Sequence, residues 1–174
     1  GGPQARLPAQ LAAQPGRRSV LVFFTSGEDR GIFGSAVYAL RPAVPVDKTL
    51  VNINVDMVGR SEGKVQGIAD GTPALFQKAI ELGAQHGVQV IPDQQPHWRI
   101  SYLTDCYHFL RLGVPAIEFF TGLHPDYHQP SDTADKIRYA EMSKILEVTT
   151  DLPRFSADGG ARPAFRRPEW FLTP

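Results

Sequence analysis

The fold of this chain is decided by residues 20–34, VLVFFTSGEDRGIFG, where an apolar run leads straight into two adjacent carboxylates. The first part, residues 20–24, is short, β-branched and aromatic, and it has no polar alternation. Such a run predicts a strand that is covered on both faces, as in a parallel sheet. The apolar residues between Gly31 and Leu40 then predict a helix, which Arg41 and Pro42 would end. Residues 28 and 29 would therefore lie in a strand-to-helix loop.

The rest of the chain continues this alternation of strands and helices. Strands are expected at residues 49–56, 64–68, 88–91 and 114–120, and helices at residues 73–87, 104–112 and 139–155. This order predicts an α/β fold: a three-layer sandwich with a central, mostly parallel mixed sheet flanked by helices. Residues 1–18 are expected to form an irregular N-terminal segment, and residues 156–174 an irregular tail.

The composition argues against several classes of function. The 18 basic and 18 acidic residues cancel, so a polyanion such as nucleic acid is not expected as a partner. No apolar run approaches the roughly 20 residues that a membrane helix needs, so membrane insertion is not expected. Cys106 is the single cysteine, which excludes an internal disulfide and a thiolate metal cluster.

Side chains suited to metal chemistry follow three of the expected strands. Glu28 and Asp29 follow the first strand, Asp56 ends the next, and His128 lies in the loop after the last. In open α/β sheets ligands bind beyond the carboxyl ends of the strands, so these side chains should gather at one edge. Carboxylate oxygen and imidazole nitrogen are suitable zinc ligands, and a further carboxylate can act as general base on a water at the metal.

Each of these residues also has an ordinary structural explanation. Glu28 and Asp29 could complement the dipole of the following helix, and Asp56 could be a turn residue at the end of a strand. His128 could be a surface histidine, and Asp105 could simply cap the helix expected at its position. Their joint placement after successive strands favours a metal site over four separate explanations.

The motifs together resemble the zinc-dependent exopeptidases of the aminopeptidase Y and bacterial leucyl aminopeptidase type, peptidase family M28, which also includes glutaminyl cyclases. The matching segments follow the family's order: residues 24–35 (FTSGEDRGIFGS), 54–59 (NVDMVG), 104–105 (TD), 112–116 (LGVPA) and 127–133 (YHQPSDT). The resemblance implies a zinc-exopeptidase-like catalytic domain over residues 19–155, with the N-terminal strands of its sheet missing.

The resemblance also implies a role for each matching position. Glu28 resembles the general base, Asp29 and His128 resemble ligands of one zinc, and Asp56 resembles a ligand of another. Asp105 resembles the acid near the substrate amine. The implied activity is that of an aminopeptidase, which hydrolyses N-terminal residues from peptides with a zinc-activated water. Two zinc ions are expected in an intact site, and one or none in this chain alone.

Two aromatic residues are further candidates for substrate binding. Tyr127 lies next to His128 in the last matching segment. Trp98 lies in a loop expected at residues 92–103, where it has no strand face to fill. Aromatic residues also commonly fill cores, which is the alternative explanation for Trp98.

The chain departs from the family pattern at three places. The family usually has two glutamates where this chain has Glu28 and Asp29, and its Ser-Asp-His triplet is here Thr-Asp-Cys, with Cys106 third. The family's first metal-binding histidine and its bridging aspartate lie upstream of the glutamate pair. This chain has no acidic residue before Glu28 and no histidine before His86. Two neighbouring metal ions need a bridging carboxylate to offset their repulsion.

Two explanations for the missing ligands are open. The chain could be the C-terminal part of a longer enzyme, or it could be naturally short, either inactive or recruiting His124 or Asp126. The first is favoured, because a sheet without its N-terminal strands exposes an apolar edge that proteins rarely leave uncovered. The expected partners are a peptide substrate and either the missing N-terminal part or another chain that covers this edge.

Two rival functions are retained. A glutaminyl cyclase would use the same zinc and acid to promote attack by the substrate's own amine. A non-catalytic binding domain of the same fold is the second rival, which the missing bridging residue supports and the retention of four site residues opposes. Bacterial members of the family are mostly exported, so a secreted or periplasmic location is expected.

Overall fold

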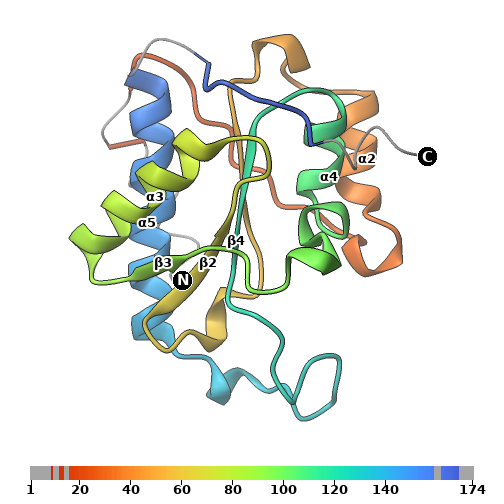
Figure 1. Ribbon diagram of the computed structural model, residues 1–174. Helices are drawn as coiled ribbons and strands as arrows, with labels where there is room; N and C mark the ends of the chain where they lie inside the picture. The colour runs from red at the N-terminus through yellow and green to blue at the C-terminus, as the bar shows by residue number, and fades with distance from the viewer. Residues whose placement is uncertain (1–8, 10–11, 14–15, 159–161, 169–174) are drawn as a thin grey trace.

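A mixed sheet lies at the centre of the computed structural model, which describes residues 9, 12–13, 16–158 and 162–168 (Figure 1). The strands are β1 (Asn52–Val55), β2 (Lys64–Ile68), β3 (Gln89–Ile91) and β4 (Ala116–Phe120). They lie in the order β1-β4-β2-β3, with β1 parallel to β4, β3 parallel to β2, and β2 antiparallel to β4. The expected mixed, mostly parallel sheet is confirmed.

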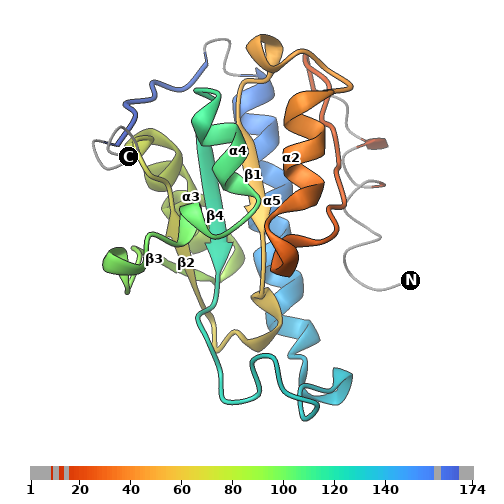
Figure 2. The same cartoon turned by 90° about the vertical axis from the view of Figure 1, so that its right-hand side faces the viewer.

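Helices cover both faces of the sheet. They are α2 (Phe33–Leu40), α3 (Pro73–His86), α4 (Cys106–Arg111) and α5 (Tyr139–Asp158). Helices α3 and α5 lie on one face, and α2 and α4 lie on the other (Figures 1 and 2). This is the three-layer arrangement that the sequence predicts.

The main core lies between the sheet and helices α3 and α5. Ile117 and Phe119 of β4 point into it and are fully buried, as are Ile145 and Val148 of α5. The alternate residues of β4 face α4, because successive side chains of a strand point to opposite faces. As the second strand in the order, β4 has neighbours on both edges, which explains why all its residues are buried.

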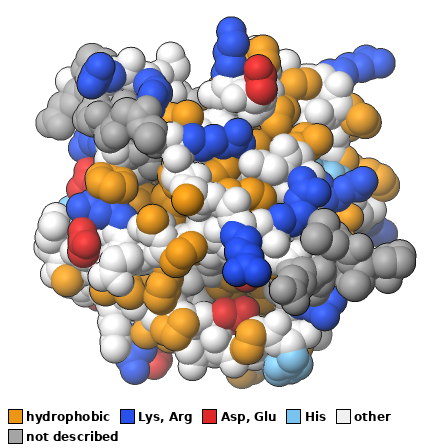
Figure 3. Space-filling view, turned by 45° about the horizontal axis from the view of Figure 1, so that its top comes forward, with side chains coloured by type: hydrophobic (Ala, Val, Ile, Leu, Met, Phe, Trp, Pro, Cys, Tyr) orange, Lys and Arg blue, Asp and Glu red, His pale blue; other side chains and the backbone are white. Residues whose placement is uncertain are grey.

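The expected strand at residues 20–24 is wrong for this structure. Residues 19–27 form no strand, and the side chain of Phe24 is 72% exposed. A strand needs a hydrogen-bonded neighbour, and no described strand is paired with this segment. A groove of about 770 Å³ instead separates it from β1. Apolar side chains are also exposed on the face that Figure 3 shows, where they lie among dispersed Lys and Arg side chains.

The other elements differ from expectation mainly at their ends. Helix α4 begins at Cys106, later than expected, and α5 continues past residue 155 to Asp158. The N-terminal segment expected at residues 1–18 and the tail expected at residues 156–174 lie partly outside the described residues. Among the described residues, none of the helices has the length and apolar character required to cross a membrane.

Replacing Gly34 by alanine should destabilise the loop that precedes α2. An added Cβ would lie 2.7 Å from both the backbone nitrogen and oxygen of Ser26, so the backbone must shift. We expect a loss of about 1–3 kcal/mol in the free energy of unfolding, measured with urea. Gly59→Ala is the control, because the atoms nearest to its Cβ belong to the side chain of Ile137, at 3.4 Å or more. Equal stability of the two variants would contradict this packing argument.

Candidate active site

Glycines shape the loop that carries the two adjacent acids. Glu28 and Asp29 lie in a short 3-10 turn, Glu28–Arg30, between Gly27 and Gly31. Both glycines have positive φ, 71° and 114°, a conformation that other residues rarely adopt. The carbonyl of Gly27 accepts a hydrogen bond from the N–H of Arg30, which closes the turn. This geometry places the two acids at the beginning of α2.

Asp29 and His128 meet although they lie far apart in the sequence. The Nε2 atom of His128 lies 3.0 Å from Oδ1 of Asp29, and both side chains are mostly exposed. The imidazole stacks on the ring of Tyr127, with ring centroids 3.8 Å apart. His128 has a positive φ of 56°, so the loop turns sharply at this residue. The expected proximity of the first and last loops is therefore present.

The acids around Glu28 influence one another's charge. Burial, followed by the neighbouring charges of Asp56, Asp29 and Asp105, raises the pKa of Glu28 to about 7, against the opposing influence of His128. Burial also raises the pKa of Asp56, and the charges of Asp105 and Asp29 act in the same direction. Like charges gathered in a partly desolvated place favour the binding of a cation or a proton.

Asp105 lies slightly deeper than the other acids. Its Oδ2 atom accepts a hydrogen bond of 2.6 Å from the hydroxyl of Thr25, and its Oδ1 atom is buried without a hydrogen-bond partner. The residue occupies the N-cap position of α4 but makes no capping hydrogen bond through its side chain. The simple capping explanation is therefore wrong, and one carboxylate oxygen is free to accept a further hydrogen bond.

A cleft of about 640 Å³ joins most of the residues that the sequence singled out. Its walls include the three metal-ligand candidates, the candidate base and both candidate aromatic residues: Asp29, Asp56, His128, Glu28, Tyr127 and Trp98. Asp105 does not line this cleft but follows Thr104, which does. Met57, Ile100 and Phe120 add apolar surface. A concave site with convergent polar groups is the usual form of a binding site for a small molecule or a chain end.

A histidine and two aspartates form a second cluster, two of whose members, His124 and Asp132, also line this cleft. Ligand atoms of His124, Asp126 and Asp132 lie within 4.8 Å of one another. Arg60 pairs with both aspartates, and Lys136 pairs with Asp126 at 2.7 Å. The hydrogen bonds from Lys136 and other neighbours hold the pKa of Asp126 well below its usual value. Because positive side chains already compensate these acids, the cluster is better explained as a clamp on the loop after β4 than as a cation site.

The donor set at the cleft fits zinc. Asp29 offers carboxylate oxygens and His128 an imidazole nitrogen, which are common zinc ligands. The ligand atoms of Asp29, Asp56 and His128 do not gather within 4.8 Å among the described residues. The assignment of Asp56 to a second ion stays a prediction.

The sequence interpretation missed the residues that support the acids. The bond from Thr25 to Asp105 and the pairs made by Arg60 depend on segments that meet only in the folded chain. Glu118 was missed as well, although an acid within the apolar run of residues 114–120 was a visible signal. It is completely buried on β4, with its side chain toward α4.

Comparison with known families decides where the chain belongs. A sequence model described as peptidase family M28 matches residues 4–152, most of the chain. The chain belongs to peptidase family M28. The match covers all seven candidate site residues of this M28 chain, although it does not test their individual roles. Among curated proteins, no relative matches it.

Solved structures share the fold of this M28 chain. An aminopeptidase from Aneurinibacillus sp. strain AM-1 is 24% identical, with a TM-score of 0.59 over 80% of this chain and 34% of its own. A zinc aminopeptidase from Bacillus subtilis is 18% identical, with a TM-score of 0.59 over 80% and 37%. A glutaminyl cyclase from Bacteroides thetaiotaomicron is 14% identical, with a TM-score of 0.62 over 87% and 59%. The chain therefore spans only part of the length of each of these structures.

Proposed function

We propose that the cleft is the active site of a zinc aminopeptidase, in which Glu28 is the general base. The observation that carries this proposal is the position of Glu28: it lies in one cleft with Asp29, His128 and Asp56, and its pKa is raised to about 7. A general base works best when its pKa lies near the working pH. Membership of a peptidase family supports the same reaction class.

The residues of the chain divide the work of hydrolysis among them. Asp29 and His128 would hold one zinc, and Asp56 a second. A zinc bound there polarises the scissile carbonyl and makes water more acidic. Glu28 takes the proton from the attacking water and delivers it to the leaving amine. Asp105 follows Thr104 of the cleft wall, and in this proposal its negative charge attracts the substrate's terminal ammonium.

The proposal also concerns the exposed edge of β1. The groove beside β1 is lined by apolar residues of the segment at 20–24 and by β1 itself. We propose that the N-terminal part of a longer polypeptide, or another chain, covers this groove in the working enzyme. That covering part would also supply the upstream histidine and bridging aspartate that the sequence lacks before Glu28.

Assays with two peptide substrates test the proposed reaction. With zinc present, this chain together with the proposed covering part should release leucine from a leucyl peptide. The rival cyclase, favoured only by the similarity to the Bacteroides fold, should instead release ammonia from a glutaminyl peptide without cleaving it. Ammonia release alone would replace the aminopeptidase proposal. Absence of both reactions, together with absence of bound zinc, would favour a binding domain.

Trp98 should contribute to the preference for the substrate's first side chain. It lines the cleft on the short turn Pro96–Trp98 and remains 41% exposed, so it can contact a ligand. We expect Trp98→Ala to raise KM for phenylalanyl peptides roughly 10-fold, because a hydrophobic contact is lost. The KM for alanyl peptides, which are too small to reach it, should change little. Equal effects on both substrates would contradict a role in specificity.

A further inference from the structure

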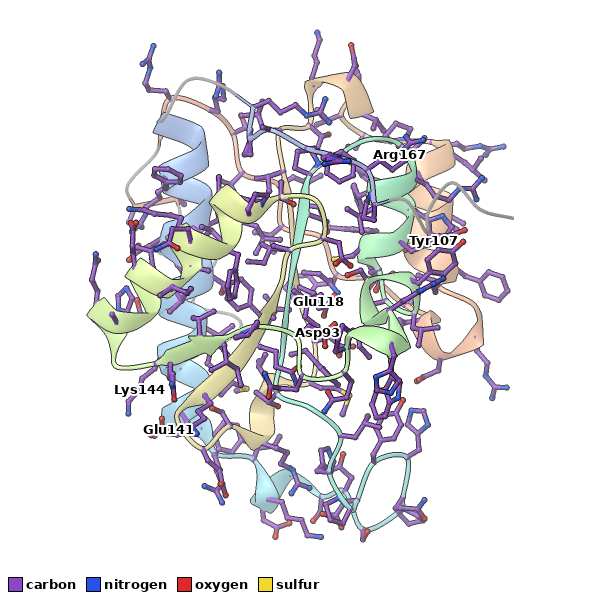
Figure 4. The ribbon with its side chains drawn as sticks, viewed as in Figure 1. Asp93, Tyr107, Glu118, Glu141, Lys144 and Arg167 are labelled. Carbon is purple, nitrogen blue, oxygen red and sulfur yellow. The ribbon has the colours of Figure 1, made fainter. Side chains whose placement is uncertain are left out.

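Glu118 is a buried acid that the proposed reaction does not use. It lies in the middle of β4, and its side chain is completely buried between β4 and α4 (Figure 4). Its neighbours along the strand, Ile117 and Phe119, belong to the apolar core on the other face. Burial raises the pKa of Glu118 to about 7, which shows how poorly this place accommodates a charge. An apolar residue would be a less costly choice if packing were the only requirement.

One oxygen of this carboxyl group joins two segments of the chain. Oε2 of Glu118 accepts hydrogen bonds from Nδ2 of Asn54, at 2.8 Å, and from the hydroxyl of Thr104, at 2.8 Å. The thiol of Cys106 donates to the same oxygen at 3.3 Å. Asn54 belongs to β1, and it is the residue paired with Glu118 in the register of β1 and β4. Thr104 and Cys106 lie at the start of α4.

These two segments each carry an acid close to Glu28: Asp56 lines the cleft, and Asp105 follows Thr104, which also lines it. Asn54 precedes Asp56 by two residues, and Thr104 and Cys106 flank Asp105 on either side. Asp56 and Asp105 are two of the acids whose charges act on Glu28. A carboxyl group that binds both segments therefore limits how far these acids can move relative to each other. Cys106, whose role the sequence left open, is one of its donors.

We propose that Glu118 is a positioning residue, which fixes Asp56 and Asp105 relative to each other by joining the end of β1 to the start of α4. The tether itself follows from the hydrogen bonds and does not depend on the reaction. Its consequence for zinc and substrate rests on the proposed function. The residue acts through Asn54, Thr104 and Cys106 and does not touch the substrate.

Hydrogen exchange and zinc titration of the full chain test this proposal. Two backbone amides report on the tethered segments. The N–H of Asp56 donates to the carbonyl of Phe119, and the N–H of Tyr107 donates to the carbonyl of Thr104. In Glu118→Leu we expect both amides to exchange about tenfold faster, because the anchoring bonds are lost. Zinc affinity, measured by calorimetry, should fall up to about tenfold, which is less than the loss when a residue hydrogen-bonded directly to a metal ligand is removed.

Two further variants separate positioning from general stability. Glu118→Gln keeps an acceptor oxygen, so it should restore slow exchange and most of the zinc affinity. Thr150→Val removes a different buried hydroxyl, bonded to the carbonyl of Leu146 within α5. It should leave the amides of Asp56 and Tyr107 and the zinc affinity unchanged. If Glu118→Leu does not fold, Thr104→Val takes its place, and the amide of Tyr107 should exchange about tenfold faster in that variant.

The outcomes distinguish the tether from the proposed function. Unchanged exchange rates at the amides of Asp56 and Tyr107 in Glu118→Leu would overturn the proposal. An equally large increase in the exchange rates of the amides throughout α3 would overturn it as well. The same local pattern in Thr150→Val would also overturn it. If the unaltered chain binds no zinc but the exchange pattern appears, the tether stands and the zinc-dependent function fails.

Discussion

Replacing Glu28 by glutamine should lower kcat by about 10²–10⁴, the usual contribution of a general base, while zinc binding is retained. Glutamine keeps the size and a hydrogen-bonding oxygen of glutamate but cannot accept the proton of the attacking water. The change affects a step of the reaction rather than substrate binding, so KM should change little. The measurement is steady-state hydrolysis of a leucyl peptide together with zinc content of the purified protein.

The control for this variant is Glu81→Gln. Glu81 lies on α3 and pairs with Lys78, away from the cleft. It should keep full activity. Near-normal turnover in Glu28→Gln would refute the role of Glu28 as base, and loss of zinc in that variant would indicate a ligand instead.

Replacing His128 by asparagine should weaken zinc binding by roughly 100-fold or more. This exceeds the loss expected when a residue that only hydrogen-bonds to a metal ligand is removed. Asparagine is chosen because it tolerates the positive φ of 56° at this position better than alanine does. Its amide lacks the imidazole nitrogen that zinc prefers. Asp29 would then lose the side chain that lies 3.0 Å from its carboxylate. Calorimetric titration with zinc measures the effect directly.

His86→Asn provides the matched histidine control. His86 lies at the end of α3 and pairs with Asp151 of α5, so its loss removes an imidazole elsewhere in the fold. Zinc affinity should remain unchanged in this variant. Equal zinc affinity of His128→Asn and the unaltered chain would exclude His128 as a ligand.

Much of the sheet could be predicted from local pattern, because its strands are short and contain β-branched residues between turn signals. The apolar run at residues 114–120 is enough to predict β4. Pro73 and the apolar periodicity after it are enough to predict α3. The apolar run at residues 20–24 carries the same signal and yet forms no strand. Its hydrogen bonds depend on a neighbour that the described residues do not provide, and no local pattern can report that condition.

The candidate site shows the same division between local and long-range information. The rule about strand ends predicted that Glu28, Asp29, Asp56 and His128 gather, and all four line one cleft. Its premise holds for Asp56 and His128, which follow β1 and β4, but the segment before Glu28 and Asp29 forms no strand. The partners that hold the acids, such as Thr25 on Asp105, arise from packing between distant segments. Their geometry is set by which side chains happen to face each other after the layers close. The individual roles in catalysis stay predictions.

The contact between Asp29 and His128 spans 99 residues of sequence, and this has a consequence for biosynthesis. A ribosome adds roughly 5–20 residues each second, so the two side chains emerge seconds apart. The carboxylate of Asp29 is therefore made before its imidazole partner, His128, and lacks it while β4 forms beside β1. In the proposed function, in which these two side chains hold zinc, the donor pair would be complete only after residue 128 has been made and the loop after β4 has folded. Zinc would then be bound late in folding rather than by the early carboxylates alone.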